Sequence, residues 1–482
     1  MNVYKRFARD TLIYGLASVL PRVVNVLLVS LHTKVLLPAS YSVNTKFYVY
    51  IAFFNVLFTY GMETAFFRFF TMLDRDRRVL RTAFTSLLIS SLFFTGLLWF
   101  FKDGISRWIG VSKDIYWIFL LILLLDTLMV IPYAWLRVMH RPYRFAFYRL
   151  SHTVIYAVFN VIFLLGMSRW LDSQSVAGGW FFSHSKVYYI FLANLIASGW
   201  VFLMFLPSLF KIGVGFDAAL WGRMIGYGLP VMVAGVFYII NENFDKIALD
   251  KLAGPEVMGS YAAVYKIGVF MVLYITAFRL GAEPFYFNQS KHPDAKRQYA
   301  VIMSGYVLSA SLLMMSVIVF LPWIVRIFIR NVAYLEALDI VPVILLAYLF
   351  LGIYFNLSIW YKLAHKTLFG TLFSAIGAVI TVLINIYCIP RWGFMASAWA
   401  TLAAYSVMTL VSYVTGRRYF PVPYAIGKIS VYVILSAMIS FVVYRYFYMN
   451  WTVKILLLLV FSLFVYLLEQ KTIRQLLKNL SR

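Results

Sequence analysis

The chain carries a tyrosine, a lysine, a glycine and a glutamate twice in one register, 220 residues apart. The two sets are Tyr41, Lys46, Gly61 and Glu63, and Tyr261, Lys266, Gly281 and Glu283. Both sets lie in apolar stretches, so each lysine falls inside an expected membrane span. A cation in a span costs about 2.5 to 3.5 kcal/mol, so each lysine is expected to have an anionic partner or ligand. The pattern predicts an internal duplication.

Two further charges, Arg22 and Asp126, lie near the middle of expected spans. The guanidinium of Arg22 suits bidentate contact with phosphate oxygens, and the alternative is an internal salt bridge to Asp126. Asp126, the one carboxylate expected at mid-span, is a candidate proton carrier for ion coupling. Its alternative is a permanent ion pair with Arg22 or Lys266. Lys46 lies closer to the end of its span, so the alternative to substrate contact is that its side chain extends to the membrane–water interface.

Two acidic residues and two arginines are expected at the cytoplasmic ends of the second and eighth spans. Glu63 could pair with Arg68, and Glu283 with Arg279, to form a gate. The alternative interpretation is a solvated helix end.

Composition places the whole chain in a membrane. Hydrophobic residues make up 63% of the 482, and only 13% are charged, which is far from the range of soluble domains. Crossing the hydrocarbon takes roughly 20 residues. Fourteen apolar runs of this length are predicted at residues 12–34, 42–65, 81–101, 115–137, 145–166, 187–210, 218–241, 257–279, 298–322, 336–360, 367–389, 393–415, 425–446 and 451–468.

The duplication and the spans predict how the chain is organised. Residues 1–212 form an N-terminal six-helix lobe, residues 213–420 a C-terminal six-helix lobe, and residues 421–482 a final helix pair with a tail. Six spans return the chain to its starting side, so the lobes should be related by a pseudo-twofold axis along the membrane normal. Lysine and arginine concentrate on the loops of the N-terminal side, which predicts cytoplasmic termini.

The sequence gives little support for nucleic-acid binding, a metal or cofactor, a primary pump or an enzyme. The net charge of +25 is attributed to topology and contact with membrane lipids rather than to nucleic acid. Cys388 is the single cysteine, and the histidines show no metal spacing, so no cofactor or metal is implied. No phosphate-binding G-x-x-x-x-G-K-[ST] loop is present for a primary pump. The D-x-D at residues 74–76 lies in a short loop, which disfavours a glycosyltransferase or ligase, and no enzyme is expected.

Three segments carry a resemblance to a known family: residues 61–68 (GMETAFFR), 245–254 (DKIALDKLAG) and 259–268 (GSYAAVYKIG). They resemble the Wzx-like polysaccharide and O-antigen flippases of the multidrug/oligosaccharidyl-lipid/polysaccharide (MOP) exporter superfamily. The resemblance implies alternating access around a cationic cavity, with Arg22, Lys46 and Lys266 on the spans that carry basic residues in related flippases. It also implies an undecaprenyl-diphosphate-linked oligosaccharide as cargo and the bacterial inner membrane as location.

Other functions stay open at this stage. A drug or cation exporter and a lipid II flippase of the same superfamily share the architecture, but an exporter of cations is expected to have an acidic cavity. A scaffold of a polysaccharide-assembly complex is a third alternative. A polysaccharide polymerase and glycosyltransferases are the protein partners that a surface-polysaccharide role would imply.

Overall fold

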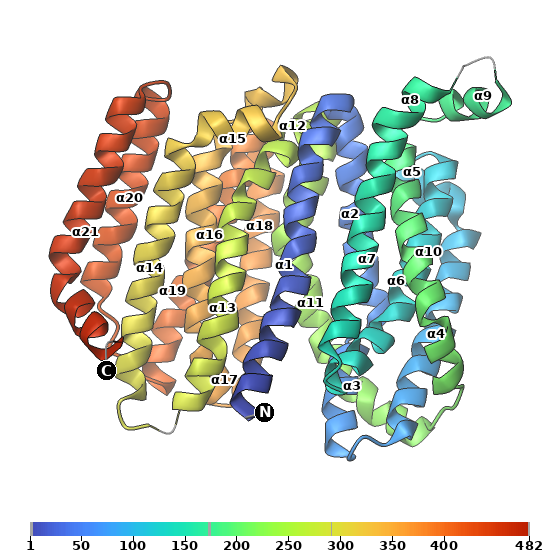
Figure 1. Cartoon of the computed structure of the whole chain (residues 1–482), viewed down its shortest axis with the longest axis horizontal. Helices are drawn as coiled ribbons and strands as arrows, with labels where there is room; N and C mark the ends of the chain where they lie inside the picture. The colour runs from blue at the N-terminus through green and yellow to red at the C-terminus, as the bar shows by residue number, and fades with distance from the viewer. Residues whose placement is uncertain (1–2, 172–174, 291, 481–482) are drawn as a thin grey trace.

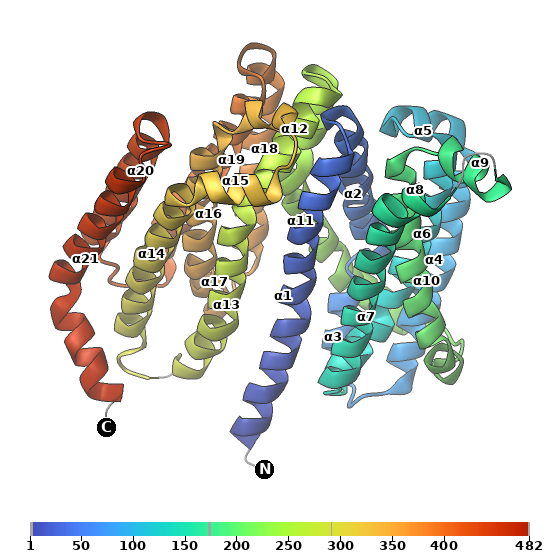
Figure 2. The same cartoon turned by 45° about the horizontal axis from the view of Figure 1, so that its top comes forward.

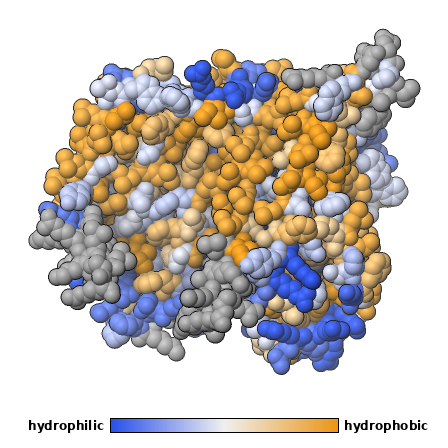
Figure 3. All heavy atoms as spheres, viewed as in Figure 1, coloured by the Kyte–Doolittle hydropathy of each residue, from blue (hydrophilic) through white to orange (hydrophobic). Residues whose placement is uncertain are grey.

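A computed structural model describes residues 3–171, 175–290 and 292–480 of the chain. Every regular element in these ranges is a helix. Fourteen helical segments are long and apolar enough to cross a membrane, which confirms the expected all-α architecture. Hydrophobic residues dominate the middle of the face in Figure 3, and hydrophilic residues gather at its upper and lower rims.

The first half of the chain contributes six spans and three short helices. The spans are α1 (Val3–Val35), α2 (Pro38–Thr59) with α3 (Met62–Met72), α4 (Arg77–Phe100), α6 (Lys113–Val138), α7 (Pro142–Val161) with η1 (Ile162–Gly166), and α10 (Lys186–Ile212). The short helices are α5 (Lys102–Ile109), α8 (Met167–Trp170) and α9 (Val176–Ser183).

The second half contributes eight spans, and its short elements lie between them. The spans are α11 (Ala218–Leu252), α12 (Pro255–Tyr265) with η2 (Lys266–Gly268) and α13 (Val269–Gln289), α14 (Ala295–Val319), α16 (Ile340–Leu357) with α17 (Ile359–Leu363), α18 (Leu368–Trp392), α19 (Phe394–Tyr419), α20 (Ile426–Tyr446) and α21 (Trp451–Leu480). The short elements are α15 (Leu321–Phe328) and η3 (Val332–Ala337).

Proline and glycine set several helix boundaries. Pro38, Pro142 and Pro255 stand in the first turns of α2, α7 and α12, where the missing N–H removes no helical hydrogen bond. The second span breaks where Gly61 takes a φ of 73°, a left-handed conformation that glycine adopts without strain. This break separates α3 from α2 within one span.

The seventh span is longer than the sequence indicated. A helix was expected over residues 218–241, but α11 runs on to Leu252 without interruption. Residues 241–246 contain five polar side chains, which lower the hydropathy enough to suggest a helix end. In the structure these side chains face protein rather than lipid, and Asp245 is 1% exposed. The polar segment is therefore part of the bundle interior.

Figures 1 and 2 show the helices of the two halves side by side, with α1, α2 and α11 near the seam between them. The additional pair α20 and α21 lies at the outer edge of the second half, where both helices pack on α14. Both described chain ends lie at the bottom of Figure 1. We call this the terminal end of the bundle, and the opposite end the far end.

The halves contact each other at both ends. At the far end α2 packs on α12, and the hydroxyl of Tyr334 donates to the carbonyl of Leu36 over 2.9 Å. At the terminal end α3 packs on α11, and the guanidinium of Arg68 lies 4.4 Å from the ring centroid of Tyr227. The space between these two sets of contacts is therefore bounded at the far end and at the terminal end.

Candidate functional site

A cavity of about 670 Å³ lies between the two halves, and we call it the central cavity. Its walls come from α1, α2, α6, α7 and α10 of the first half and from α11, α12, η2, α13 and α16 of the second. Most of the lining is polar or aromatic. The polar and aromatic lining residues are Asn25, His32, Tyr41, Asn44, Thr45, Tyr48, Asp126, Arg149, His152, Thr153, Tyr156, Asn194, Glu242, Asn243, Lys246, Tyr265, Lys266 and Tyr348.

Lys266 lines the central cavity from the second half. It begins η2, the short 3₁₀ turn that interrupts the eighth span between α12 and α13. Its neighbours Tyr265 and Ile267 are buried, whereas the lysine side chain stays accessible. Among the described residues no carboxylate forms an ion pair with Lys266, and the positive charge of Lys246 acts on it. An anion entering the cavity would meet an uncompensated cation here.

Arg149 is a second cation of the cavity, and the sequence reasoning missed it. It lies on α7, and its guanidinium is 5.7 Å from the ring centroid of Tyr133. No ion pair joins Arg149 to a carboxylate within the described ranges. Residue 149 lies inside the expected span 145–166, and a charge within an expected span was the signal that could have identified it.

Asp126 faces the same cavity from α6. Its Oδ1 accepts a hydrogen bond of 2.9 Å from Ser198, whose hydroxyl also lies 3.3 Å from Nε2 of His152. In the part of the chain that the structure describes, no ion pair links Asp126 to Arg22 or Lys266. Its nearby cation is Arg149, whose charge acts on it from the neighbouring helix.

Arg22 lies at the seam but is not among the residues that line the central cavity. Its guanidinium donates a hydrogen bond of 2.6 Å to the hydroxyl of Thr276 on α13, so it connects the first half to the second. Pro21 and Asn25, on either side of it along α1, do line the cavity. Arg22 is therefore next to the cavity, and its side chain is exposed.

Lys46 also lies outside the lining of the central cavity. Its ammonium group is 3.0 Å from Oδ2 of Asp250 on α11, and the two side chains are only 10% and 8% exposed. The lysine thus does not face the space where Lys266 lies. It forms a buried ion pair between the two halves.

Of the two ion pairs expected in the gate, one is present and the other is replaced by a different pair. Arg279 and Glu283 are paired at 3.0 Å, and Lys362 joins the same carboxylate at 2.8 Å. Glu63, however, pairs with Arg137 at 2.9 Å. The expected partnership of Glu63 with Arg68 is wrong.

The reason is helical geometry. Side chains three or four positions apart share a helix face, whereas Glu63 and Arg68 are five positions apart and lie on different faces of α3. Arg68 instead stacks on Tyr227 of the second half. Arg279 and Glu283 are four residues apart and share a face of α13.

A second acidic group borders the central cavity on α11, one residue beyond the expected span 218–241, so it was not among the charges expected at mid-span. Glu242 lines the cavity and accepts a hydrogen bond from the hydroxyl of Tyr405. One turn further on, Asp245 pairs with Lys246 at 2.9 Å and accepts a hydrogen bond of 2.6 Å from Tyr261. The cavity thus has three basic side chains and two acidic ones besides its histidines.

Glycine allows the halves to touch at the far end. A Cβ on Gly259 would lie 1.9 Å from the carbonyl oxygen of Pro38, and both atoms belong to backbones that cannot rotate away. Ordinary contact begins near 3.4 Å. An alanine at this position therefore requires α2 and α12 to separate by about 1.5 Å, the difference between 3.4 and 1.9 Å.

We expect Gly259→Ala to open the far end of the bundle. In a helix, replacing glycine by alanine would otherwise be favourable by about 1 kcal/mol. A loss of contact between the halves in this variant would therefore arise from the clash with Pro38 and not from helix propensity. The measurement is the distance between spin labels at Trp108 and Val332, exposed far-end sites in the two halves, with Cys388 replaced. Gly305→Ala is the control because an added Cβ there meets nothing within 4 Å. Equal label distances in Gly259→Ala and Gly305→Ala would contradict the role of the Gly259 and Pro38 contact in holding the far end closed.

The fold is that of a polytopic helical membrane protein with a cavity between the two halves of the chain. The structure is similar to that of the lipid II flippase MurJ in an inward closed conformation, with a TM-score of 0.73 at 16% sequence identity over 96% of this chain and 100% of that chain. It is also similar to an inward-facing multidrug resistance MATE family transporter of the MOP superfamily, with a TM-score of 0.60 at 12% identity over 90% and 99% of the two chains.

A third similar structure is a MOP superfamily transporter from Pyrococcus furiosus, described as having a binding pocket of reverse polarity. Its TM-score is 0.58 at 12% identity over 89% of this chain and 95% of that chain. The MatE family model matches residues 230–387, which is less than half of the chain. No protein of curated function gives a significant match. The chain therefore has the fold of MOP superfamily transporters.

Proposed function

We propose that this protein moves a polyprenyl-diphosphate-linked oligosaccharide across the bacterial inner membrane, from the cytoplasmic to the outer leaflet, for assembly of a surface polysaccharide. The observation that carries the proposal is the central cavity, in which Lys266 and Arg149 are accessible and have no carboxylate partner among the described residues. The termini are cytoplasmic in this proposal. Movement follows alternating access of the two halves.

The chemistry of the cargo explains why such a cavity is needed. A diphosphate and its sugars cannot cross hydrocarbon without a hydrated route, whereas the polyprenyl tail can stay in lipid. Ammonium and guanidinium groups bind phosphate oxygens by charge-assisted hydrogen bonds, which are about twice as strong as neutral ones. Lys266 from the second half and Arg149 from the first face one cavity, so both halves can contribute to binding.

A cation exporter is less well supported by the same residues. The two carboxylates of the cavity, Asp126 and Glu242, already accept hydrogen bonds from Ser198 and Tyr405. An organic cation would also meet Lys266 and Arg149, whose charges repel it. A lipid II flippase is the second candidate, favoured by the similarity in fold to MurJ.

The experiment that tests the proposal is headgroup translocation in proteoliposomes. Three fluorescent cargoes are compared: an undecaprenyl-diphosphate oligosaccharide, lipid II and an organic cation. Translocation of the oligosaccharide above protein-free vesicles, with and without an imposed ion gradient, supports the proposal. Translocation of lipid II alone would replace it by the second candidate, and transport of the cation alone would overturn the anionic-cargo interpretation.

Ion coupling is assigned to Asp126, with Glu242 as a second candidate. We expect Asp126→Asn to remove the dependence of transport on the proton gradient, because asparagine can accept the hydrogen bond from Ser198 but cannot carry a proton. The measurement is the translocation rate at several external pH values. Glu242→Gln is compared in the same assay, and Asp103→Asn, in the exposed pair with Lys113, is the control. Unaltered pH dependence in Asp126→Asn would exclude it as the proton carrier.

A further inference from the structure

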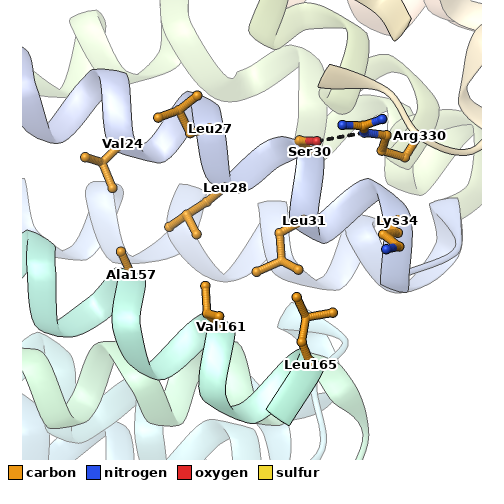
Figure 4. A pocket seen from close by; sticks show the side chains of 10 residues that line it. All are labelled: Val24, Leu27, Leu28, Ser30, Leu31, Lys34, Ala157, Val161, Leu165 and Arg330. Atoms are coloured by element: carbon orange, nitrogen blue, oxygen red, sulfur yellow. Dashed lines mark hydrogen bonds between the residues drawn. The ribbon is translucent and has the colours of Figure 1, made fainter. Parts of the chain in front are cut away.

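A second hollow, separate from the central cavity, lies on the outside of the first half between α1 and α7. It has a volume of about 670 Å³ and is lined along most of its length by aliphatic side chains (Figure 4). Leu27 and Val161, on its two walls, are 57% and 47% exposed. We call it the α1–α7 groove. Because its aliphatic walls belong to two membrane-spanning helices, the surrounding medium is the hydrocarbon of the bilayer.

One end of the α1–α7 groove is cationic. Lys34 of the first half and Arg330 of the second are the only charged side chains among the described residues that line it. Nε of Arg330 donates a hydrogen bond of 3.1 Å to Ser30, as Figure 4 shows, and its backbone N–H donates to Thr33 over 3.2 Å. Arg330 is thus held against α1 at the far end, and the described residues of the lining include no carboxylate to neutralise it.

The length of the groove matches half a bilayer. Its lining on α1 runs from Val24 to Lys34, and at 1.5 Å per residue these ten steps span about 15 Å. The hydrocarbon core is about 30 Å thick, so the apolar part covers one leaflet and the cations reach its headgroup level. One acyl chain fits these dimensions, whereas a polyprenyl chain is several times longer than the groove.

We propose that the α1–α7 groove binds an anionic glycerophospholipid of the far leaflet. Its phosphate lies between Lys34 and Arg330, and one acyl chain lies along Leu27, Leu31 and Val161. Since the two cations belong to different halves of the chain, the bound lipid bridges the halves at the far end and favours the arrangement in which they touch. Leu28 lines both the groove and the central cavity, so α1 alone separates the lipid from the transport route. This inference does not depend on the identity of the cargo.

The test is a lipid titration of the full chain, followed by native mass spectrometry. Phosphatidylglycerol, phosphatidylcholine and undecaprenyl phosphate are added separately to delipidated protein. We expect phosphatidylglycerol to bind best, and Lys34→Ala plus Arg330→Ala to weaken it by about 25-fold, about fivefold for each cation. Lys102→Ala plus Arg107→Ala removes two cations of α5, a helix of the first half that does not line the groove, and should leave binding unchanged.

A second variant, Ala157→Phe, fills the groove without removing a charge, and it should also reduce phosphatidylglycerol binding. Thermal unfolding in lipid-free micelles shows whether each variant is folded. Equal binding of phosphatidylcholine would overturn the role of the cations. Stronger binding of undecaprenyl phosphate would overturn the phospholipid as the occupant, and unchanged binding in folded Ala157→Phe would overturn the groove as the site.

Discussion

Replacement of Lys266 by alanine is expected to lower headgroup translocation by about 10- to 100-fold. The lysine is an accessible cation in the central cavity without an ion-pair partner among the described residues. Hydrogen bonds to charged groups contribute about 1.5 to 3 kcal/mol, which corresponds to this range of rates if the contact is made as the headgroup crosses. The measurement is the initial rate of translocation in proteoliposomes with matched protein content.

Controls separate loss of charge from loss of structure. Lys266→Arg keeps the cation and should retain most of the rate, while Lys211→Ala removes an exposed lysine at the end of α10 and should have no effect. Arg22→Ala should lower the rate less than Lys266→Ala, because the Arg22 guanidinium contacts Thr276 beside the cavity. Full transport by Lys266→Ala would contradict the cationic cavity as the route of an anionic cargo.

Hydropathy was sufficient to predict the number of spans. Each crossing must satisfy its own backbone hydrogen bonds and expose apolar side chains to lipid, so every span leaves a long apolar run in the sequence. The prediction failed locally at α11, where Glu242, Asp245 and Lys246 interrupt that run. These side chains face protein partners rather than lipid, and hydropathy cannot distinguish the two environments.

The site was less predictable because its contacts join residues that are distant in sequence. Lys266 could be identified as an unusual charge in a span, and it does line the central cavity. The partner of Lys46 is Asp250, 204 residues further along the chain, and neither spacing nor composition indicates this pair. Pairs that are close in sequence were easier to predict. Arg279 and Glu283, four residues apart on one helix, were expected to pair and are paired.

The described charges at the two ends have different environments. At the terminal end, Glu63 and Arg137 both belong to the first half and are 43% and 47% exposed, so water competes with this ion pair and it adds little to the contact between the halves. At the far end, Lys46 and Asp250 are nearly enclosed. Opening the far end must separate a desolvated ion pair, and this makes the Lys46 and Asp250 contact a strong contribution to the arrangement in which the far end is closed.

Asp250→Ala is accordingly expected to destabilise the protein by about 3 to 5 kcal/mol, because it leaves the ammonium group of Lys46 buried without a counter-charge. The measurement is equilibrium unfolding in mixed micelles. Asp103→Ala is the matched control: it breaks the pair with Lys113 on the first half, whose side chains are 59% and 75% exposed, and should change stability little.

The double replacement Lys46→Met plus Asp250→Leu distinguishes an unpaired charge from lost packing. If the desolvated charge causes the instability, this variant should recover most of the stability, since apolar side chains of similar size can replace a buried pair without loss. The same variant no longer needs to separate charges, so its far end should open more readily than that of the native protein. A double variant as unstable as Asp250→Ala would show that packing, not charge, holds α2 to α11.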